Sequence, residues 1–262
     1  MQNKYLLYID ILGFSHLVRA DETRVDTLYE IIDSLNVHRH HAFKTLVFSD
    51  TILVYNTIEP QSKHDHQYLV MYACEFAQNL LYETIGLDYH FRAILTYGKF
   101  QHYQLEHIDA FYGKGLISAY TIEKKIFCTG LFIDKKSNSY NNIFSVSRYD
   151  DNLSFVYLNQ TLDRLLLDHE AGPLPVKGDL LADMDMHWHL AKDVRMLQDV
   201  HNLMRTHKDP LVRAKFLAAW DFFYQRYPKF INLMVKKNFD LGIIAPDLDW
   251  SEANARIGNL RY

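Results

Sequence analysis

The stretch Tyr5-Leu-Leu-Tyr-Ile-Asp-Ile-Leu-Gly-Phe-Ser15 is the part of this sequence that decides the fold. Its apolar and aromatic residues predict a buried strand that carries one carboxylate, Asp10, near its end. Burying an acidic side chain costs free energy unless something pairs with it, and a divalent cation is one such partner. Gly13 predicts a turn, where backbone N–H groups are able to approach a phosphate. The stretch therefore predicts a strand that leads into a polar site.

A second stretch, Lys44 to Tyr55, repeats this arrangement, with Asp50 between two apolar runs. It predicts two antiparallel strands, Phe43 to Phe48 and Ile52 to Tyr55, joined by a turn at Ser49-Asp50-Thr51. Together the two stretches predict two carboxylates on neighbouring strands.

The composition is that of a globular protein with a substantial core. Hydrophobic residues make up 48% of the 262 positions and aromatic residues 14%, which excludes a disordered chain. The length suits one large domain, or an ordinary domain with an extension. The formal net charge of −4 argues against broad nucleic-acid binding, although a local basic pocket for one triphosphate is compatible with it.

The sequence also indicates a compartment. Two cysteines, Cys74 and Cys128, are too few for a disulfide framework and lack metal-ligand spacing, which fits a reducing environment. The first strand follows the N-terminus without the basic and apolar regions of a signal peptide, and no apolar run is long enough to span a bilayer. We therefore expect a cytoplasmic protein with neither a membrane nor a nucleic acid as its partner.

Helical and extended patterns alternate along the next part of the chain. After the first strand, the predicted elements are a helix over 21–35, the hairpin, a helix over 69–87, a strand over 89–97, a short strand over 108–111, a helix over 113–125, a strand over 126–133 and a hairpin over 141–158. The order β-α-β-β-α-β, followed by a helix and further strands, predicts an α+β fold with a ferredoxin-like core.

Beyond residue 160 the pattern is helical. It predicts a short helix over 161–167 and two long helices over 189–207 and 211–237, the last kinked by Pro228. No motif in this part predicts chemistry. We therefore divide the chain into an N-terminal domain, 1–160, and a C-terminal helical extension, 161–262, for packing or dimerisation.

Histidines offer one alternative metal site. They gather at positions 38–41, 64–66 and 187–189. None of these groups has the i, i+4 spacing or the cysteine partners of a zinc site, so we assign no metal to them.

Four short motifs in the N-terminal part carry a family resemblance. Asp10-Ile-Leu-Gly-Phe-Ser15 ends the first strand, Ser49-Asp50 lies in the hairpin turn, Arg92 precedes Gly98 on a later strand, and Gly113 through Glu123 begins and fills a helix. In this order they resemble the motifs of the class III nucleotide cyclases. The resemblance extends over roughly residues 4 to 158. Each motif alone is weak, so the resemblance depends on their order.

This resemblance implies a nucleotide cyclase domain over residues 1–160 that binds two divalent cations, Mn²⁺ or Mg²⁺. The cations would be held by the carboxylates of Asp10 and Asp50 and by the carbonyl of Ile11. They would activate the ribose 3′-hydroxyl, which attacks the α-phosphate in line and releases pyrophosphate.

The resemblance also implies how the phosphates are bound. The backbone amides of the first turn would cradle them at the start of a helix; these residues are Leu12, Gly13, Phe14 and Ser15. Arg92 lies inside a strand and needs an anionic partner there, either a phosphate or a carboxylate.

The sequence departs from the family where the base is bound. The adenine-reading Lys of the family falls on Leu46, and its partner Asp falls on Ala110, or on Asp109 if the alignment shifts by one residue. The Asn of the dimer-contact helix falls on Ile117 and its transition-state Arg on Thr121. The metal-binding half of the site is therefore preserved, whereas the base-binding half is not.

A small cyclase of this kind is similar to the bacterial pyrimidine cyclases of anti-phage defence. The similarity implies a homodimer that converts UTP to 3′,5′-cyclic UMP and pyrophosphate, with the active site between two chains. The product would activate a separate effector. Two alternatives remain open: a cyclase that uses CTP, ATP or GTP, and a non-catalytic nucleotide-binding or dimerisation module.

Overall fold

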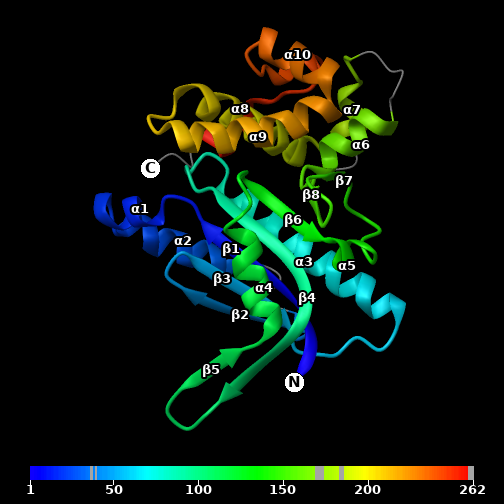
Figure 1. Ribbon diagram of the computed structural model, residues 1–262. Helices are drawn as coiled ribbons and strands as arrows, with labels where there is room; N and C mark the ends of the chain where they lie inside the picture. The colour runs from blue at the N-terminus through cyan, green and yellow to red at the C-terminus, as the bar shows by residue number, and fades with distance from the viewer. Residues whose placement is uncertain (36–37, 39, 169–173, 183–185, 259–262) are drawn as a thin grey trace. The chain divides into compact units, whose positions relative to one another are not determined.

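The computed structural model describes residues 1–35, 38, 40–168, 174–182 and 186–258 (Figure 1). The chain forms two compact units. Unit 1 consists of Met1–Glu83 and Tyr89–Leu158, and unit 2 of Thr84–Asp88 and Asn159–Tyr262. The predicted division into domains at residue 160 stays a proposal, and each unit is described below by itself.

Unit 1 is built on one sheet in which the strand order is β2-β3-β1-β4-β6-β8-β7, and β5 pairs with β4 outside this order. The strands are β1 Gln2–Ile11, β2 Phe43–Phe48, β3 Thr51–Asn56, β4 Phe91–Gln104, β5 Asp109–Tyr112, β6 Gly130–Asp134, β7 Val146–Arg148 and β8 Leu153–Val156. β1 lies between β3 and β4 and is antiparallel to both. The first four strands and the helices between them confirm the predicted α+β, ferredoxin-like core.

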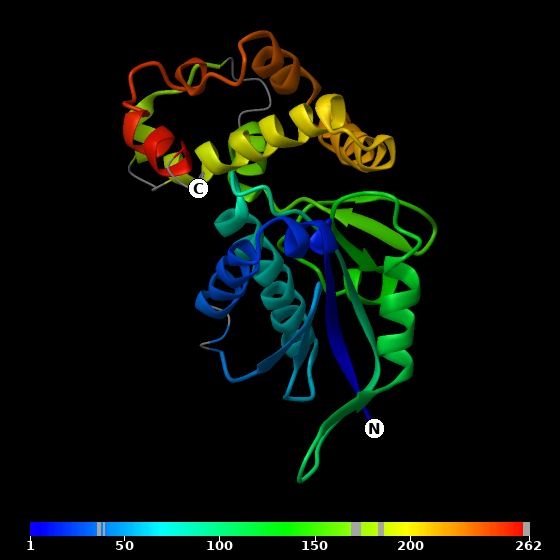
Figure 2. The same ribbon diagram turned by 90° about the vertical axis from the view of Figure 1, so that its left-hand side faces the viewer.

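Helices cover both faces of this sheet. Helices α2 (Thr23–Ser34) and α3 (Lys63–Thr84) lie on one face and α4 (Lys114–Glu123) lies on the other (Figure 2). Two short helices complete the unit, α1 (Phe14–Ala20) and α5 (Lys135–Asn138).

The side chains of β1 alternate between the two faces, as the pleat of a strand requires. Tyr5 points toward α3, where its hydroxyl lies 2.7 Å from Nδ1 of His66. Tyr8 points toward α4, where its ring lies edge-on to that of Tyr120, with the ring centres 6.3 Å apart. Asp10 is two residues beyond Tyr8 and therefore belongs to the α4 face.

Helix α4 lies unusually close to the sheet because glycines line the contact. A Cβ atom at Gly98 of β4 would be 2.8 Å from the Cα of Gly115 of α4, closer than real side chains come. Gly113, which precedes the helix, has a φ of 155°, and a Cβ there would lie 2.2 Å from the carbonyl oxygen of Lys99. Glycine at these positions therefore sets the distance between α4 and β4.

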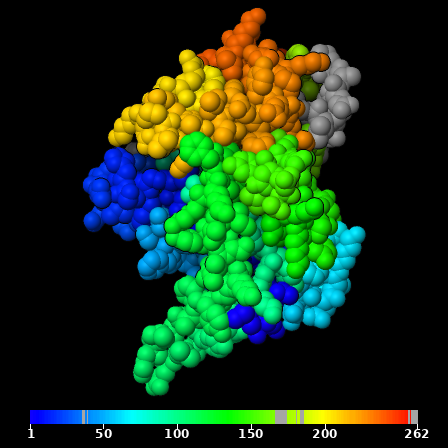
Figure 3. Space-filling model, in the orientation of Figure 1, coloured from blue at the N-terminus to red at the C-terminus, as the bar shows by residue number. Residues whose placement is uncertain are grey.

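Several elements of unit 1 differ from the predictions. Helix α1, which directly follows Gly13, was not predicted, and the helix predicted over 21–35 is α2, Thr23–Ser34. Helix α3 begins at Lys63 rather than Leu69, because Ser62 and Asp65 cap it reciprocally: each side chain accepts a hydrogen bond from the amide of the other, at 3.1 and 3.0 Å. Strand β4 continues past Gly98 and forms with β5 an arm that extends away from the other elements of the unit (Figure 3).

Unit 2 is helical, as predicted. Its elements are α6 Gln160–Asp168, α7 Gly178–Ala182, α8 Met186–Thr206, α9 Pro210–Arg226, α10 Pro228–Lys236, a 3₁₀ helix Leu241–Ile243 and α11 Ser251–Gly258. Pro228 does not kink one long helix. The chain leaves the helical conformation at Tyr227 (φ −126°, ψ 49°), and Pro228 begins a new helix, where its missing N–H costs nothing.

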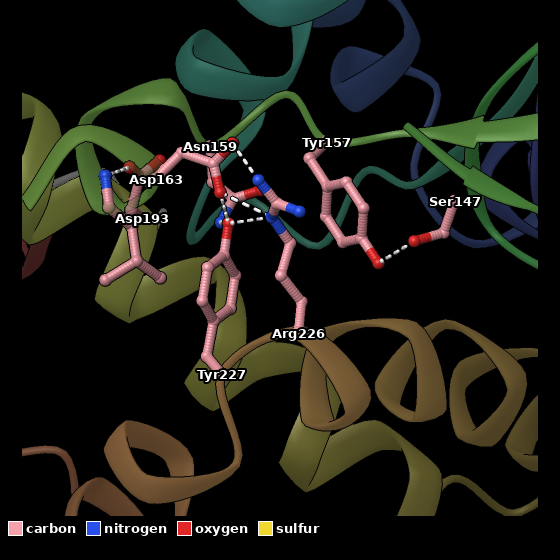
Figure 4. A network of polar contacts seen from close by, with 8 residues as sticks. Ser147, Tyr157, Asn159, Asp163, Asp193, Arg226 and Tyr227 are labelled. Carbon is pink, nitrogen blue, oxygen red and sulfur yellow. Dashed lines mark hydrogen bonds and ion pairs between the residues drawn. The ribbon is translucent and has the colours of Figure 1, made fainter. Parts of the chain in front are cut away.

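A buried polar network ties the helices of unit 2 together (Figure 4). The Arg226 guanidinium donates two hydrogen bonds to the carboxylate of Asp163, at 2.6 and 2.7 Å, and the Tyr227 hydroxyl donates to the same carboxylate. The carboxylate of Asp193, on α8, accepts the amide of Leu162 at 2.9 Å and so caps α6. The buried carboxylates of Asp163 and Asp193 thus have partners within this unit and stabilise its fold. None of the helices within the described residues is long and apolar enough to cross a membrane.

Candidate active site

Asp10 and Asp50 lie at the same end of two neighbouring strands. In the antiparallel pair of β1 and β3, Asp10 is opposite Thr51, the residue that follows Asp50. Beyond this pair, the amide of Ile11 donates a 2.9 Å hydrogen bond to the carbonyl oxygen of Asp50. The structure therefore brings together the two strand ends that carry the predicted metal ligands.

The hydroxyl of Tyr8 lies 3.3 Å from Oγ1 of Thr51, the residue after Asp50. Burial raises the pKa of Tyr8, its hydrogen bond with Thr51 lowers it, and the negative charges of Glu123, Asp10 and Asp50 raise it further. One phenol on the α4 face is thus exposed to the field of three carboxylates.

The turn that carries Asp50 has a fixed shape. Ser49 has a φ of 55°, a left-handed conformation that is uncommon for residues other than glycine. The Tyr29 hydroxyl of α2 donates a 3.1 Å hydrogen bond to the Ser49 carbonyl. This role of Tyr29 was not predicted, because an exposed tyrosine in an amphipathic helix carries no signal for it.

The glycine turn after β1 presents backbone amides. Gly13 has a φ of 75° and directly precedes α1. The Leu12 amide is already used, since it donates a 2.8 Å hydrogen bond to the carbonyl oxygen of His90. The amides of Gly13, Phe14 and Ser15 have no hydrogen-bond acceptor among the described residues. Three of the four predicted phosphate-binding amides are therefore available.

Arg92 has carboxylate partners. It lies opposite Asp10 in the pair of β1 and β4, and its Nη2 is 3.4 Å from Oδ2 of Asp10. The same Nη2 forms an ion pair with Glu123 of α4, and Nη1 donates a 2.9 Å hydrogen bond to the Ile126 carbonyl. Of the two partners predicted for Arg92, the structure shows the carboxylate.

Glu123 is the residue of this cluster that the sequence analysis did not single out. Its side chain is 3% exposed, and a buried carboxylate needs a cationic partner. The pairing joins residues that are distant in sequence, so neither stretch alone predicts it.

A cavity of about 530 Å³ opens on the α4 face, and one of its lining residues, Thr51, is opposite Asp10 in the strand pair. It brings together Leu46 and Ile117, two of the predicted base-pocket residues. The residues that line it are Tyr8, Leu46, Phe48, Thr51, Leu53, Phe111, Leu116, Ile117 and Tyr120. A cavity with apolar walls and three hydroxyl groups suits a flat ring that carries a few polar atoms.

The other predicted base-pocket residues lie elsewhere. Asp109 and Ala110 belong to the β4–β5 arm, where Ala110 is opposite Tyr103 and the Asp109 carboxylate lies 3.2 Å from Nε2 of His102. Neither lines the cavity, and their neighbour Phe111 does. Their assignment to a base pocket stays a prediction, and within this chain β5 pairs with the extended end of β4. Thr121 is exposed on α4 and does not line the cavity either.

The oxygen ligands of this site fit a hard divalent cation whose coordination shell is completed by the substrate. Among the described residues, no group of three or more acidic, histidine or cysteine side chains is able to hold a metal ion. Mg²⁺ is usually bound by one or two carboxylates together with waters and substrate phosphates. Asp10 and Asp50, beside a turn with available amides, therefore suit a cation whose other ligands are waters and substrate phosphates. They do not suit a metal ion that is held by protein ligands alone.

This chain is similar to solved nucleotide cyclase domains in the path of its backbone. The monomeric guanylyl cyclase domain of the RhoGC fusion protein from the aquatic fungus Blastocladiella emersonii is 14% identical and covers 59% of this chain and 94% of its own, with a TM-score of 0.48. The guanylate cyclase domain of RhGC from Catenaria anguillulae, solved with GTP, is 11% identical and covers 60% and 96%, with a TM-score of 0.46.

The adenylyl cyclase CyaB from P. aeruginosa is 12% identical and covers 60% of this chain and 94% of its own, with a TM-score of 0.45. No protein-family model matches the sequence, and no curated protein matches it. Identities this low concern the fold and leave the substrate open.

Proposed function

We propose that this chain is a nucleotide cyclase that converts UTP to 3′,5′-cyclic UMP and pyrophosphate. One observation carries the proposal: Asp10 and Asp50 lie on adjoining strand ends tied by the bond from Ile11 to Asp50, next to a turn with available amides. This is the arrangement that the four sequence motifs predict for a class III cyclase.

Each part of the site has a role in this reaction. Asp10, Asp50 and the Ile11 carbonyl would hold two Mn²⁺ or Mg²⁺ ions. Such cations, when bound, supply the positive charge that acidifies the ribose 3′-hydroxyl and neutralises the triphosphate. The amides of Gly13, Phe14 and Ser15 would bind phosphate oxygens at the start of α1. The protein thus places the hydroxyl and the α-phosphate in line.

The base would enter the cavity between the sheet and α4. Leu46 and Ile117 offer it apolar contacts, and the hydroxyls of Tyr8, Thr51 and Tyr120 offer hydrogen bonds. No lysine–aspartate pair for a purine occurs among the described residues that line this cavity. We therefore favour a pyrimidine, with UTP as the substrate and CTP, ATP and GTP as the alternatives to be compared.

A homodimer is part of the proposal. Exposed apolar side chains gather on β2, the arm and α4; they include Phe48 at 81%, Ile117 at 67%, Ile108 at 61% and Tyr112 at 52%. Burying such side chains against a second copy would be favourable. In that dimer, residues of the α4 face, including Thr121, would complete the site of the other chain. We place this dimer in the cytoplasm, where the product would signal to a separate effector, by analogy with pyrimidine cyclases of antiviral defence.

Two observations favour a second candidate, a nucleotide-binding module without activity. Thr121 stands where the family has its transition-state Arg, and the guanidinium of Arg92 is used by carboxylates. This candidate predicts Mn²⁺-dependent nucleotide binding without product.

The purified full chain, incubated with Mn²⁺ and each of the four nucleoside triphosphates in turn, tests the proposal. We expect cyclic UMP and pyrophosphate from UTP, identified by chromatography against standards. A cyclic product from another triphosphate would show that the substrate is not UTP and would still support the cyclase reaction. If none of the four gives a cyclic product, the enzymatic proposal is overturned. Mn²⁺-dependent nucleotide binding without product would then support the non-catalytic nucleotide-binding module.

A further inference from the structure

Three charged side chains form a row that crosses unit 1 from β1 to α4. Asp10 is at one end, Arg92 of β4 is in the middle and Glu123, the last residue of α4, is at the other end. Arg92 contacts both carboxylates through the same nitrogen, Nη2. A charge on one carboxylate therefore influences how strongly the guanidinium is drawn to the other.

The two ends of the row differ in burial and in contact distance. The Glu123 side chain is 3% exposed, whereas that of Asp10 is 24% exposed. The contact of Arg92 with Asp10 is long, at 3.4 Å, compared with about 2.7–2.9 Å for a strong charge-assisted hydrogen bond. Nε of Arg92 is buried and has no hydrogen-bond partner among the described residues. The guanidinium thus forms an ion pair with the buried carboxylate of Glu123, whose Oε1 accepts no hydrogen bond from the described residues, and makes only a long contact with Asp10.

We propose that Arg92 is a positioning residue for Asp10, and that Glu123 controls how strongly Arg92 competes with a divalent cation for the Asp10 carboxylate. This inference rests on the proposed cyclase function, which assigns a cation to Asp10. With Glu123 charged, the pair it forms with Arg92 is close to neutral and Asp10 keeps its charge for the cation. Without that charge, Arg92 turns to Asp10 and its positive charge opposes the cation.

The affinity for Mn²⁺ measures this competition without any turnover. We would measure the binding of 3′-deoxy-UTP, which lacks the attacking hydroxyl and is not turned over, to the full chain over a range of Mn²⁺ concentrations, and take the apparent affinity for Mn²⁺ from it. Glu123→Gln should weaken Mn²⁺ binding about tenfold, the size of effect seen when groups that orient a metal ligand are changed. As a matched control, Asp199→Asn removes an acid that pairs with Arg195 in unit 2 at 2.9 Å and should leave the affinity unchanged.

A double variant separates competition from a general disturbance of the site. Replacing both members of the buried pair by apolar residues, as in Arg92→Met/Glu123→Leu, is often tolerated by a fold. It removes the competing cation, so Mn²⁺ should bind at least as tightly as to the wild type. This variant also tests the proposal if Glu123→Gln alone does not fold.

Three outcomes decide between the proposals. Weaker binding in Glu123→Gln together with recovery in the double variant supports the inference. Wild-type affinity in Glu123→Gln, with binding lost in Asp10→Asn, overturns the inference and leaves the metal site of the proposed function in place. An affinity that Asp10→Asn does not change overturns the metal site itself, and the inference with it.

Discussion

The amide of Ile11 donates a 2.9 Å hydrogen bond to the carbonyl oxygen of Asp50. This bond joins the end of β1 to the turn before β3, so the Asp10 and Asp50 positions are fixed by backbone hydrogen bonding. Their side chains can therefore be changed with little effect on the strands that carry them.

Asp10→Asn and Asp50→Asn should each lower cyclase activity about a hundredfold or more, because a carboxylate ligand is replaced by a weaker neutral one. The initial rate of cyclic UMP formation measures the loss. Asp26→Asn, on the exposed side of α2, is the control and should keep full activity. Activity that persists in either site variant, at an unchanged melting temperature, would exclude that aspartate as a ligand.

Arg92→Met should lower the free energy of unfolding by about 3–5 kcal/mol, because it leaves the buried Glu123 carboxylate without its cation. Urea unfolding measures the change. The double variant Arg92→Met/Glu123→Leu should recover most of the loss. A single variant as stable as the wild type would show that Glu123 is not paired in solution as it is here.

Ile117→Trp should fill the cavity without harming the fold, since the Ile117 side chain is 67% exposed. We expect the KM for UTP to rise about tenfold or more, because apolar contact with the base is replaced by a clash. Mn²⁺ affinity should stay the same. Ile143→Trp, at a position that is 49% exposed and outside the cavity lining, is the control. Equal KM values in the two variants would exclude the cavity as the base site.

Gly115→Ala should destabilise unit 1 by about 1–3 kcal/mol, the usual cost of overpacking. The added Cβ would lie 2.8 Å from Cδ1 of Leu6 and 3.0 Å from the backbone of Gly98. Ser118→Ala, on the exposed side of α4, should change stability little. Thermal unfolding compares the two variants, and equal melting temperatures would contradict the close contact of α4 with β4.

The stability of the protein should fall above pH 10, in part through Tyr55. Burial, and then the charge of Asp109, raise the pKa of Tyr55 to about 12, compared with about 10 in an unfolded chain. The folded state therefore keeps this proton while the unfolded state loses it, so the contribution is complete below about pH 10 and is lost as the pH rises toward 12. Urea unfolding of the wild type and of Tyr55→Phe between pH 9 and 11 measures it. The difference in stability between the two should shrink with pH, and a constant difference would contradict the shift.

The sequence predicted the elements whose signals are local. The apolar run around Asp10 and the hairpin around Asp50 predicted β1, β2 and β3 with small errors at their ends. The signals for these strands, apolar runs and turn residues, lie within each stretch. The start of α3 was missed although Ser62 and Asp65 form a capping box that is visible in the sequence.

Features that depend on distant residues could not be predicted in this way. Gly98 was taken as the end of a strand, yet β4 runs through it, and the glycine is required by the approach of Gly115. The partner of Arg92 was left open between a phosphate and a carboxylate, and only the fold places Glu123 beside it. Asp109 was assigned by alignment to the base pocket, and the pairing of β5 with β4 carries it into the arm.

The position of β1 in the middle of the sheet has a consequence for synthesis on the ribosome. Asp10 emerges 82 residues before its neighbour Arg92. Until β4 has been made, β1 lacks one of the two strands that flank it, and forming such long-range pairs is slow. A nascent chain therefore carries the Asp10 carboxylate through about half of the synthesis of unit 1 before that side chain has its neighbours, and truncated chains that end before β4 should be digested by proteases more readily than the full chain.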